Sequence, residues 1–187
     1  MLNRISQRIY QYSKGWLVIV SLLILMFFII SVLPAESKKS QSDTNSTTSP
    51  DTSFFYNTRE LYQMAEDYGV EGRAAYIRAR FSFDLIWPIV YTFFLLTGIS
   101  WLSQRTLSTA SPFQVINLAP LFAIILDLLE NISTSIVMAR FPQQTMLIDS
   151  LAPVFSALKW IFVIFSFLLL LGLCVMYLRK KFFISQR

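Results

Sequence analysis

A long apolar run at residues 113–139, sufficient to cross a membrane, contains three strongly polar residues within about one helical turn. They are Asp127, Glu130 and Asn131. Positions i, i+3 and i+4 share one helical face, so the three side chains are predicted to point the same way. Each carboxylate at the centre of a spanning helix costs about 2.5–3.5 kcal/mol on insertion scales. We therefore expect this face to look into protein, because lipid offers no hydrogen bonds.

Polar residues elsewhere in the chain can complete this group. Lys159 lies inside the last apolar run. Arg73, Arg80, Asp84 and Tyr91 follow one another at helical spacing, before and inside the second apolar run. Arg80 and Asp84 are four residues apart and can form an ion pair on one helix. We therefore add these five residues to the candidate ligand-binding or buried polar cluster.

Counting depth along the helices places the intramembrane polar residues in one layer. At 1.5 Å per residue, Lys159, Tyr91, Glu130 and Asp127 fall roughly 8–16 Å below the outer membrane boundary. We expect Lys159 to pair with Glu130 or Asp127. The other carboxylate is left for an arginine of the second helix or for a proton.

Three kinds of function fit such a cluster. It can be a structural staple that sets helix register, through hydrogen bonds of about 0.6–2 kcal/mol each. It can form an outward-facing pocket that binds or transports a polar ligand or lipid headgroup, with Lys159 and the arginines contacting an anion. It can also be an intramembrane enzyme that uses Asp127 and Glu130 as an acid/base pair.

The enzyme hypothesis has the least support in the sequence. One turn of separation on one helix is weak evidence for paired catalysis, and no HExxH, GxSxG, GxGD-type or phosphate-binding motif occurs. We name no catalytic residue. We expect a non-enzymatic membrane protein whose cluster is a staple, with the binding or transport pocket as the alternative.

Composition excludes several chemistries. The 187-residue chain is 55% hydrophobic and has no histidine, which removes Ser-His-Asp systems and His-ligated zinc. Its one cysteine, Cys174, cannot form an intramolecular disulfide or a Cys-rich metal site. We expect no cofactor and no metal. The net charge of +5 comes from basic residues scattered around the apolar runs, so we predict membrane lipids as partners, with a second copy or another membrane protein, and no nucleic acid.

Four apolar runs predict an all-α integral membrane protein, a bundle of four transmembrane helices. The predicted spans are 16–33, 84–103, 113–139 and 154–178, with loops at 104–112 and 140–153 and tails at 1–15 and 179–187. The first span reads as an uncleaved signal anchor, since its apolar run is long and Leu33-Pro34-Ala35 is a poor cleavage site. It carries no charged residue, so we expect it to be peripheral.

An extracytoplasmic segment is predicted before the second span. Residues 34–56 are rich in Ser and Thr and nearly devoid of apolar side chains until their end, which predicts a flexible linker. Helices are expected over 57–83. Asn57 and Glu60 have capping-box spacing, and Gly69 should stop that first helix. The next helix is expected to continue without a break into the span.

Lysine and arginine counts predict the orientation. The N-terminal tail has three and the C-terminal tail four, whereas the short loops have one each. Because short cytoplasmic segments carry the excess of basic residues, both termini should be cytoplasmic in a multi-pass protein of the cell (cytoplasmic) membrane.

Overall fold

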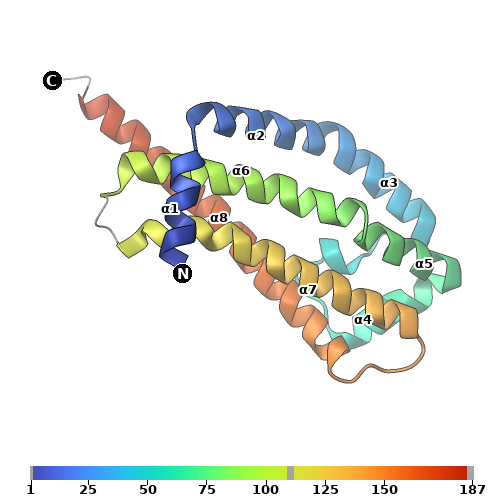
Figure 1. The fold of residues 1–187 in the computed structure, drawn as a ribbon. Coiled ribbons are helices and arrows are strands. Elements are labelled where there is room, and N and C mark those ends of the chain that lie inside the picture. Colours follow the sequence, from blue (N-terminus) through green and yellow to red (C-terminus); the bar gives the residue numbers. More distant parts are fainter. Residues whose placement is uncertain (1, 109–111, 185–187) are drawn as a thin grey trace.

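Helices joined by short turns make up the molecule, and the described residues contain no β-strand. The structure is a computed structural model and describes residues 2–108 and 112–184. Its four long helical stretches run beside one another along its length (Figure 1). The short helix Leu2–Tyr12 crosses one end of this bundle, and the short helix Thr58–Asp67 lies at the other end.

The elements have the following bounds. The N-terminal half contains α1 (Leu2–Tyr12), α2 (Gly15–Phe27), the π-helical turn η1 (Phe28–Val32), α3 (Leu33–Thr44), the 3-10 turn η2 (Pro50–Thr52), α4 (Thr58–Asp67) and α5 (Gly69–Arg80). The C-terminal half contains α6 (Phe83–Thr106), the 3-10 helix η3 (Pro112–Leu118), α7 (Ala119–Arg140) and α8 (Ile148–Ile184).

Four helical stretches are long and apolar enough to cross a membrane, as predicted. They are Gly15–Thr44, Gly69–Thr106, Val115–Arg140 and Ile148–Phe182. The most apolar part of the first stretch is only 11% buried, against 56% and 44% for the second and third. The helix α2 is therefore peripheral, as its lack of charge predicted, and α6 and α7 are central.

The segment 34–56 differs from the expected flexible linker. Helix α2 continues through η1 into α3 as far as Thr44, because an established helix adds polar residues without a new nucleation step. The end of α3 packs closely on α5: a Cβ placed on Gly72 would lie 3.2 Å from the Thr44 Cα. Beyond α3, the Tyr68 hydroxyl donates to the Thr48 carbonyl at 2.7 Å. This segment is thus an ordered part of the fold.

Helix α4 begins at the predicted capping box. The Asn57 side chain accepts from the Glu60 N–H at 3.0 Å, and the Glu60 carboxylate accepts from the Asn57 N–H at 2.8 Å. Gly69 has a φ of +61°, which lets the chain turn directly from α4 into α5.

The predicted unbroken helix from there into the second span is interrupted. Ser82 leaves the helical conformation, with φ −128° and ψ −93°, between α5 and α6. Its hydroxyl donates to the Arg78 carbonyl at 2.8 Å and so satisfies a carbonyl at the end of α5.

Helix α1 and the C-terminal part of α8 lie at the same end of the bundle (Figure 1). The tail expected at 1–15 is mostly the helix α1, and Gln104 of α6 donates to the Tyr10 carbonyl at 2.8 Å.

The third span, expected to be helical from residue 113, becomes α-helical only at Ala119. Pro120 lacks an N–H and is best accommodated in the first turn of a helix.

Two hydrophobic clusters form the core. The first joins α4, α5, α7 and the start of α8 around Leu61, Ala65 and Val137. The second joins α2, α6 and α8 around Leu95, Ile99 and Leu173. Charged side chains from α5, α6, α7 and α8 lie between these two regions.

Candidate functional site: a charged cluster beside a cavity

Helix α7 presents its three polar residues to the protein interior. Asp127, Glu130 and Asn131 are all buried and lie on one face. Lys159 on α8 is buried opposite them. Its Nζ lies 3.1 Å from Asp127 Oδ1 and 2.5 Å from Glu130 Oε2. The expected pairing is therefore present, and one ammonium group contacts both carboxylates.

Glu130 has a second partner that the sequence did not suggest. The Tyr56 hydroxyl, from the segment before α4, donates to Glu130 Oε1 at 3.2 Å. Burial, together with the nearby Glu130 charge, raises the pKa of Tyr56 well above its usual value, so the hydroxyl keeps its proton and remains a donor. The Glu130 carboxylate is thus held from both sides.

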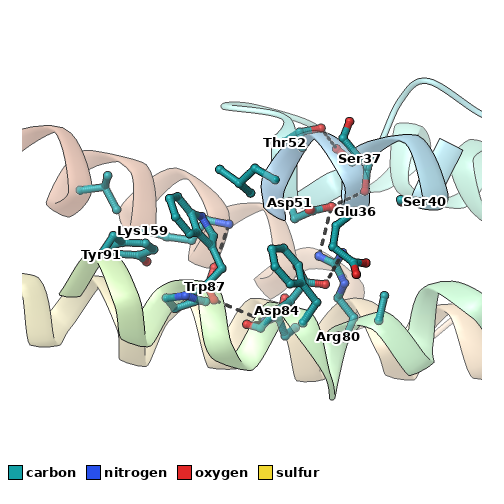
Figure 2. Close-up of a pocket in the computed structure, with 18 of the residues that line it drawn as sticks. Glu36, Ser37, Ser40, Asp51, Thr52, Arg80, Asp84, Trp87, Tyr91 and Lys159 are labelled. Atoms are coloured by element: carbon teal, nitrogen blue, oxygen red, sulfur yellow. Dashed lines mark hydrogen bonds and ion pairs between the residues drawn. The ribbon is translucent and has the colours of Figure 1, made fainter. Parts of the chain in front are cut away.

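Arg80 forms the second charged group, at the end of α5. Its guanidinium lies 2.6 Å from Asp84 Oδ2 and 3.1 Å from Asp51 Oδ1, and its Cζ lies 4.5 Å from the centre of the Tyr76 ring. Figure 2 shows Asp51 reaching Arg80 from the side opposite α5 and α6. The interruption at Ser82 does not prevent the predicted i, i+4 pair.

Asp51 was not predicted, because it lies in the segment expected to be a flexible linker. Burial opposes its ionisation, but the Arg80 guanidinium and the Ser49 hydroxyl hold the pKa of the Asp51 carboxyl below its usual value of 3.8. No periodicity marks it, since η2 is only three residues long. Only the folded chain places it over Arg80.

Asn131 connects the two ion-paired groups. Its Nδ2 lies 3.4 Å from Asp127 Oδ2 and 3.5 Å from the Asp84 carbonyl oxygen. We call the six ionisable residues that meet here the charged cluster: Asp51, Arg80, Asp84, Asp127, Glu130 and Lys159.

Arg73 does not join this cluster, contrary to expectation. Its guanidinium donates to the Ala65 carbonyl at 2.7 Å and lies 4.7 Å from the centre of the Phe141 ring. Carbonyls in the last turn of a helix lack intrahelical partners and attract cations. The end of α4 therefore takes Arg73 away from the face that Arg80 occupies.

A cavity of about 410 Å³ borders the charged cluster. Asp51, Arg80, Asp84, Asp127 and Lys159 contribute to its lining, but Glu130 does not. Tyr91 was predicted to border the site, and it lines the cavity. In Figure 2 it lies near Lys159.

The lining changes character along the cavity. Polar side chains of α3 and of the segment after it line one part, among them Glu36, Ser37 and Ser40 (Figure 2). Apolar side chains from two helical stretches, Gly15–Thr44 and Ile148–Phe182, line another part: Leu25, Ile29, Leu33, Val163 and Phe167. Pockets that hold small ligands typically have volumes of roughly 300–1,000 Å³, and this one falls in that range.

Fold and site together define an all-helical protein with four helices suited to a membrane and a cavity beside buried ion pairs. Comparison of the chain with protein-family models, curated proteins and solved structures finds no match.

Proposed function

We propose that this protein is a non-enzymatic, multi-pass membrane protein that binds an amphipathic ligand in the cavity between α2–α3, α6 and α8. The polar head lies against the charged cluster, and the hydrocarbon chain lies among the apolar residues. The observation that carries this proposal is the cavity lining, which joins ion-paired carboxylates to apolar side chains of membrane-length helices. A purely polar ligand would leave the apolar part unused.

The helical stretch that closes one side of the cavity supports ligand entry. Helix α2 is mostly exposed, and its described polar contact with α6 is the 3.1 Å hydrogen bond between the Ser21 and Thr97 hydroxyls. The π-helical turn η1 contributes Ile29 to the cavity. Single π-helical turns within α-helices occur frequently at functional sites. Because few polar contacts hold α2 against α6, the hydrocarbon chain of a ligand in the bilayer can enter the cavity beside α2.

The structural staple remains part of the proposal, but for one carboxylate only. The Glu130 side chain is 1% exposed and contacts Lys159 and Tyr56. We assign it to holding α7, α8 and the segment before α4 together. Asp127 shares the same lysine but lines the cavity, so we assign it to the ligand. A buried Glu130 cannot reach a ligand in this cavity, which disfavours an Asp127–Glu130 acid/base pair.

The orientation proposed from basic residues places both termini in the cytoplasm and the cavity in the outer half of the cell membrane. Membrane lipids are then the neighbours of α2 and α8, whose side chains Leu23 and Leu168 are 64% and 61% exposed.

Photolabelling in phosphatidylcholine nanodiscs tests ligand binding. The probes are three single-chain amphiphiles with a diazirine on a dodecyl chain and an alcohol, carboxylate or ammonium head. We expect at least one probe to label the buried Leu25 or the adjoining Val163, as mapped by peptide mass spectrometry. Ile29→Trp, which fills the cavity, should strongly reduce this labelling. Ile30→Trp is the matched control, since Ile30 is 67% exposed and outside the cavity.

The proposal is contradicted if none of the three probes labels Leu25 or Val163. It is equally contradicted if Ile29→Trp and Ile30→Trp leave the labelling of these residues unchanged, since the probe would then be reaching them from the surrounding bilayer.

A further inference from the structure

We propose that the polar head of the ligand is a cation, an ammonium group attached to a hydrocarbon chain. This inference rests on the proposed function and names the class of ligand. It replaces the idea, drawn from the sequence, that Lys159 and the arginines contact an anion.

The first observation is the balance of charge in the cluster. Lys159 contacts Asp127 and Glu130, and Arg80 contacts Asp51 and Asp84. Four carboxylates against two cations leave a formal charge of −2. Glu36 adds a further carboxylate to the lining, and its own partner, Lys39, is 3.8 Å away and does not line the cavity. Uncompensated charge in a low-dielectric layer is costly, so a cation bound here is stabilised.

The second observation is which groups the cavity meets. The side chains of Arg80 and Lys159 are 4% and 5% exposed, whereas those of Asp51, Asp84 and Asp127 are 24%, 15% and 10% exposed. Both cations also line the cavity, but they expose less of their side chains than the carboxylates do, and each is already ion-paired. An incoming head therefore meets carboxylate oxygens, which accept hydrogen bonds and attract positive charge.

The third observation is the aromatic part of the lining. Trp87, Tyr91 and Trp160 all border the cavity, and the rings of Trp87 and Tyr91 lie 5.7 Å apart in an edge arrangement. Faces of such rings attract organic cations. Within the described residues, no three Asp, Glu, His or Cys side chains are grouped as metal ligands. An organic ammonium fits this lining better than a bare metal ion does.

Binding of three head groups on one dodecyl chain tests the inference. Dodecylammonium, dodecanol and dodecanoate are titrated against the full chain in phosphatidylcholine nanodiscs at neutral pH, with the unfolding midpoint and Trp fluorescence as readouts. We expect dodecylammonium to bind most tightly. Asp127→Asn and Asp84→Asn should each weaken it about tenfold and leave dodecanol within about twofold, because each removes one charge-assisted contact. Each variant keeps a carboxylate for its cation: Glu130 for Lys159, and Asp51 for Arg80.

Glu71→Gln is the matched control. Glu71 is exposed on α5 and does not line the cavity, so its change removes one negative charge from the molecule without touching the site. It should leave dodecylammonium binding unchanged. An equal loss in Glu71→Gln would show that the general field of the protein, and not the cavity, sets the preference.

The outcomes separate the two proposals. If none of the three amphiphiles binds, the proposed function fails and this inference fails with it. If dodecanol or dodecanoate binds as tightly as dodecylammonium, the cavity binds amphiphiles but the cationic head is wrong. If dodecylammonium is preferred but Asp84→Asn and Asp127→Asn do not reduce the preference, the charged cluster is not its site.

Two further arms identify the source of the head group. Phosphatidylcholine carries a quaternary ammonium that donates no hydrogen bond. Replacing it by phosphatidylethanolamine in the nanodiscs should therefore compete with dodecylammonium if the natural ligand is a lipid with a primary ammonium head. Absence of competition favours a free single-chain amine. The number of protons released on binding is measured as well. A cation that adds positive charge to the cluster releases none. Release of one proton for each cation bound would mean that protons, and not a ligand, normally balance the negative charge of the cluster.

Discussion

The Asp51 carboxylate lies 3.1 Å from the guanidinium of Arg80, although the chain forms the helix α4 between them and Arg80 is the last residue of the next helix, α5. This ion pair fixes the segment after α3 over the end of α5. The membrane-length helices alone supply three carboxylates to the cluster, and Asp51 adds a fourth. Several measurable consequences depend on it and on its neighbours.

Replacing Asp51 should destabilise the protein in a pH-dependent way. The folded-state pKa of Asp51 is lowered, so its stabilising effect is fully present above its ordinary value of 3.8 and is lost as the pH falls through the folded-state value. Asp51→Asn should lower the free energy of unfolding by about 1–3 kcal/mol at neutral pH. Denaturant titrations in neutral-detergent micelles should show this difference shrinking below pH 3.8.

The matched control for that measurement is Asp43→Asn, since Asp43 is exposed on α3. Asp43→Asn should leave the free energy of unfolding unchanged at pH 7 and at pH 3. A difference between wild type and Asp51→Asn that stays constant from pH 7 to pH 3 would show that the carboxylate charge is not what Arg80 recognises.

Lys159→Met should be strongly destabilising, because it strands two buried carboxylates. Breaking a buried pair in this way typically costs about 3–5 kcal/mol. Adding Glu130→Gln to Lys159→Met should recover part of that loss. Adding Asp127→Asn should recover less, because Asp127 borders the cavity whereas Glu130 is only 1% exposed. Unfolding titrations of the single and double variants measure the coupling, and strictly additive losses would rule out direct pairing.

Gly72→Ala should push α3 away from α5. The new Cβ would lie 3.2 Å from the Thr44 Cα and 3.3 Å from the Asp43 carbonyl oxygen, both backbone atoms with little freedom to move. We expect a loss of about 1–3 kcal/mol, as for overpacking elsewhere. Gly172→Ala in α8 is the matched control, since nothing lies within 4 Å of its Cβ position and Ala is the better helix former. If both variants have the same thermal unfolding midpoint, α3 does not pack on α5.

The proposed orientation predicts the accessibility of single cysteines in a Cys174→Ser background. Glu66→Cys on α4 should react with a membrane-impermeant maleimide in intact cells. Tyr12→Cys, at a side chain that is 74% exposed at the other end of the bundle, should react only after the membrane is permeabilised. Reaction of both cysteines in intact cells, or of Tyr12→Cys alone, would contradict the orientation.

Much of the architecture could be predicted from local patterns. Apolar runs of membrane length identified four helices, and the Asn57–Glu60 spacing identified the start of α4. The spacing of Asp127, Glu130 and Asn131 placed them on one face, and the cost of isolated charge in lipid indicated that Lys159 would meet them. The helices, the cap and the shared face depend on periodicity within one or two turns, whereas the pairing with Lys159 follows from the transfer free energy of each charged side chain.

The tertiary structure alone decided what covers the cluster and what it leaves open. The polarity of residues 34–56 argued against a buried segment, yet close packing at Gly72 and the Arg80 charge order it, and it supplies Asp51 and Tyr56. Arg73 has the helical spacing of the predicted polar face, but its guanidinium donates to the Ala65 carbonyl at the end of α4 instead. The cavity itself depends on side chains from four separate helical stretches. Local patterns determine which face of a helix is polar, whereas contacts between distant residues determine whether that face is sealed or meets a space that a ligand can occupy.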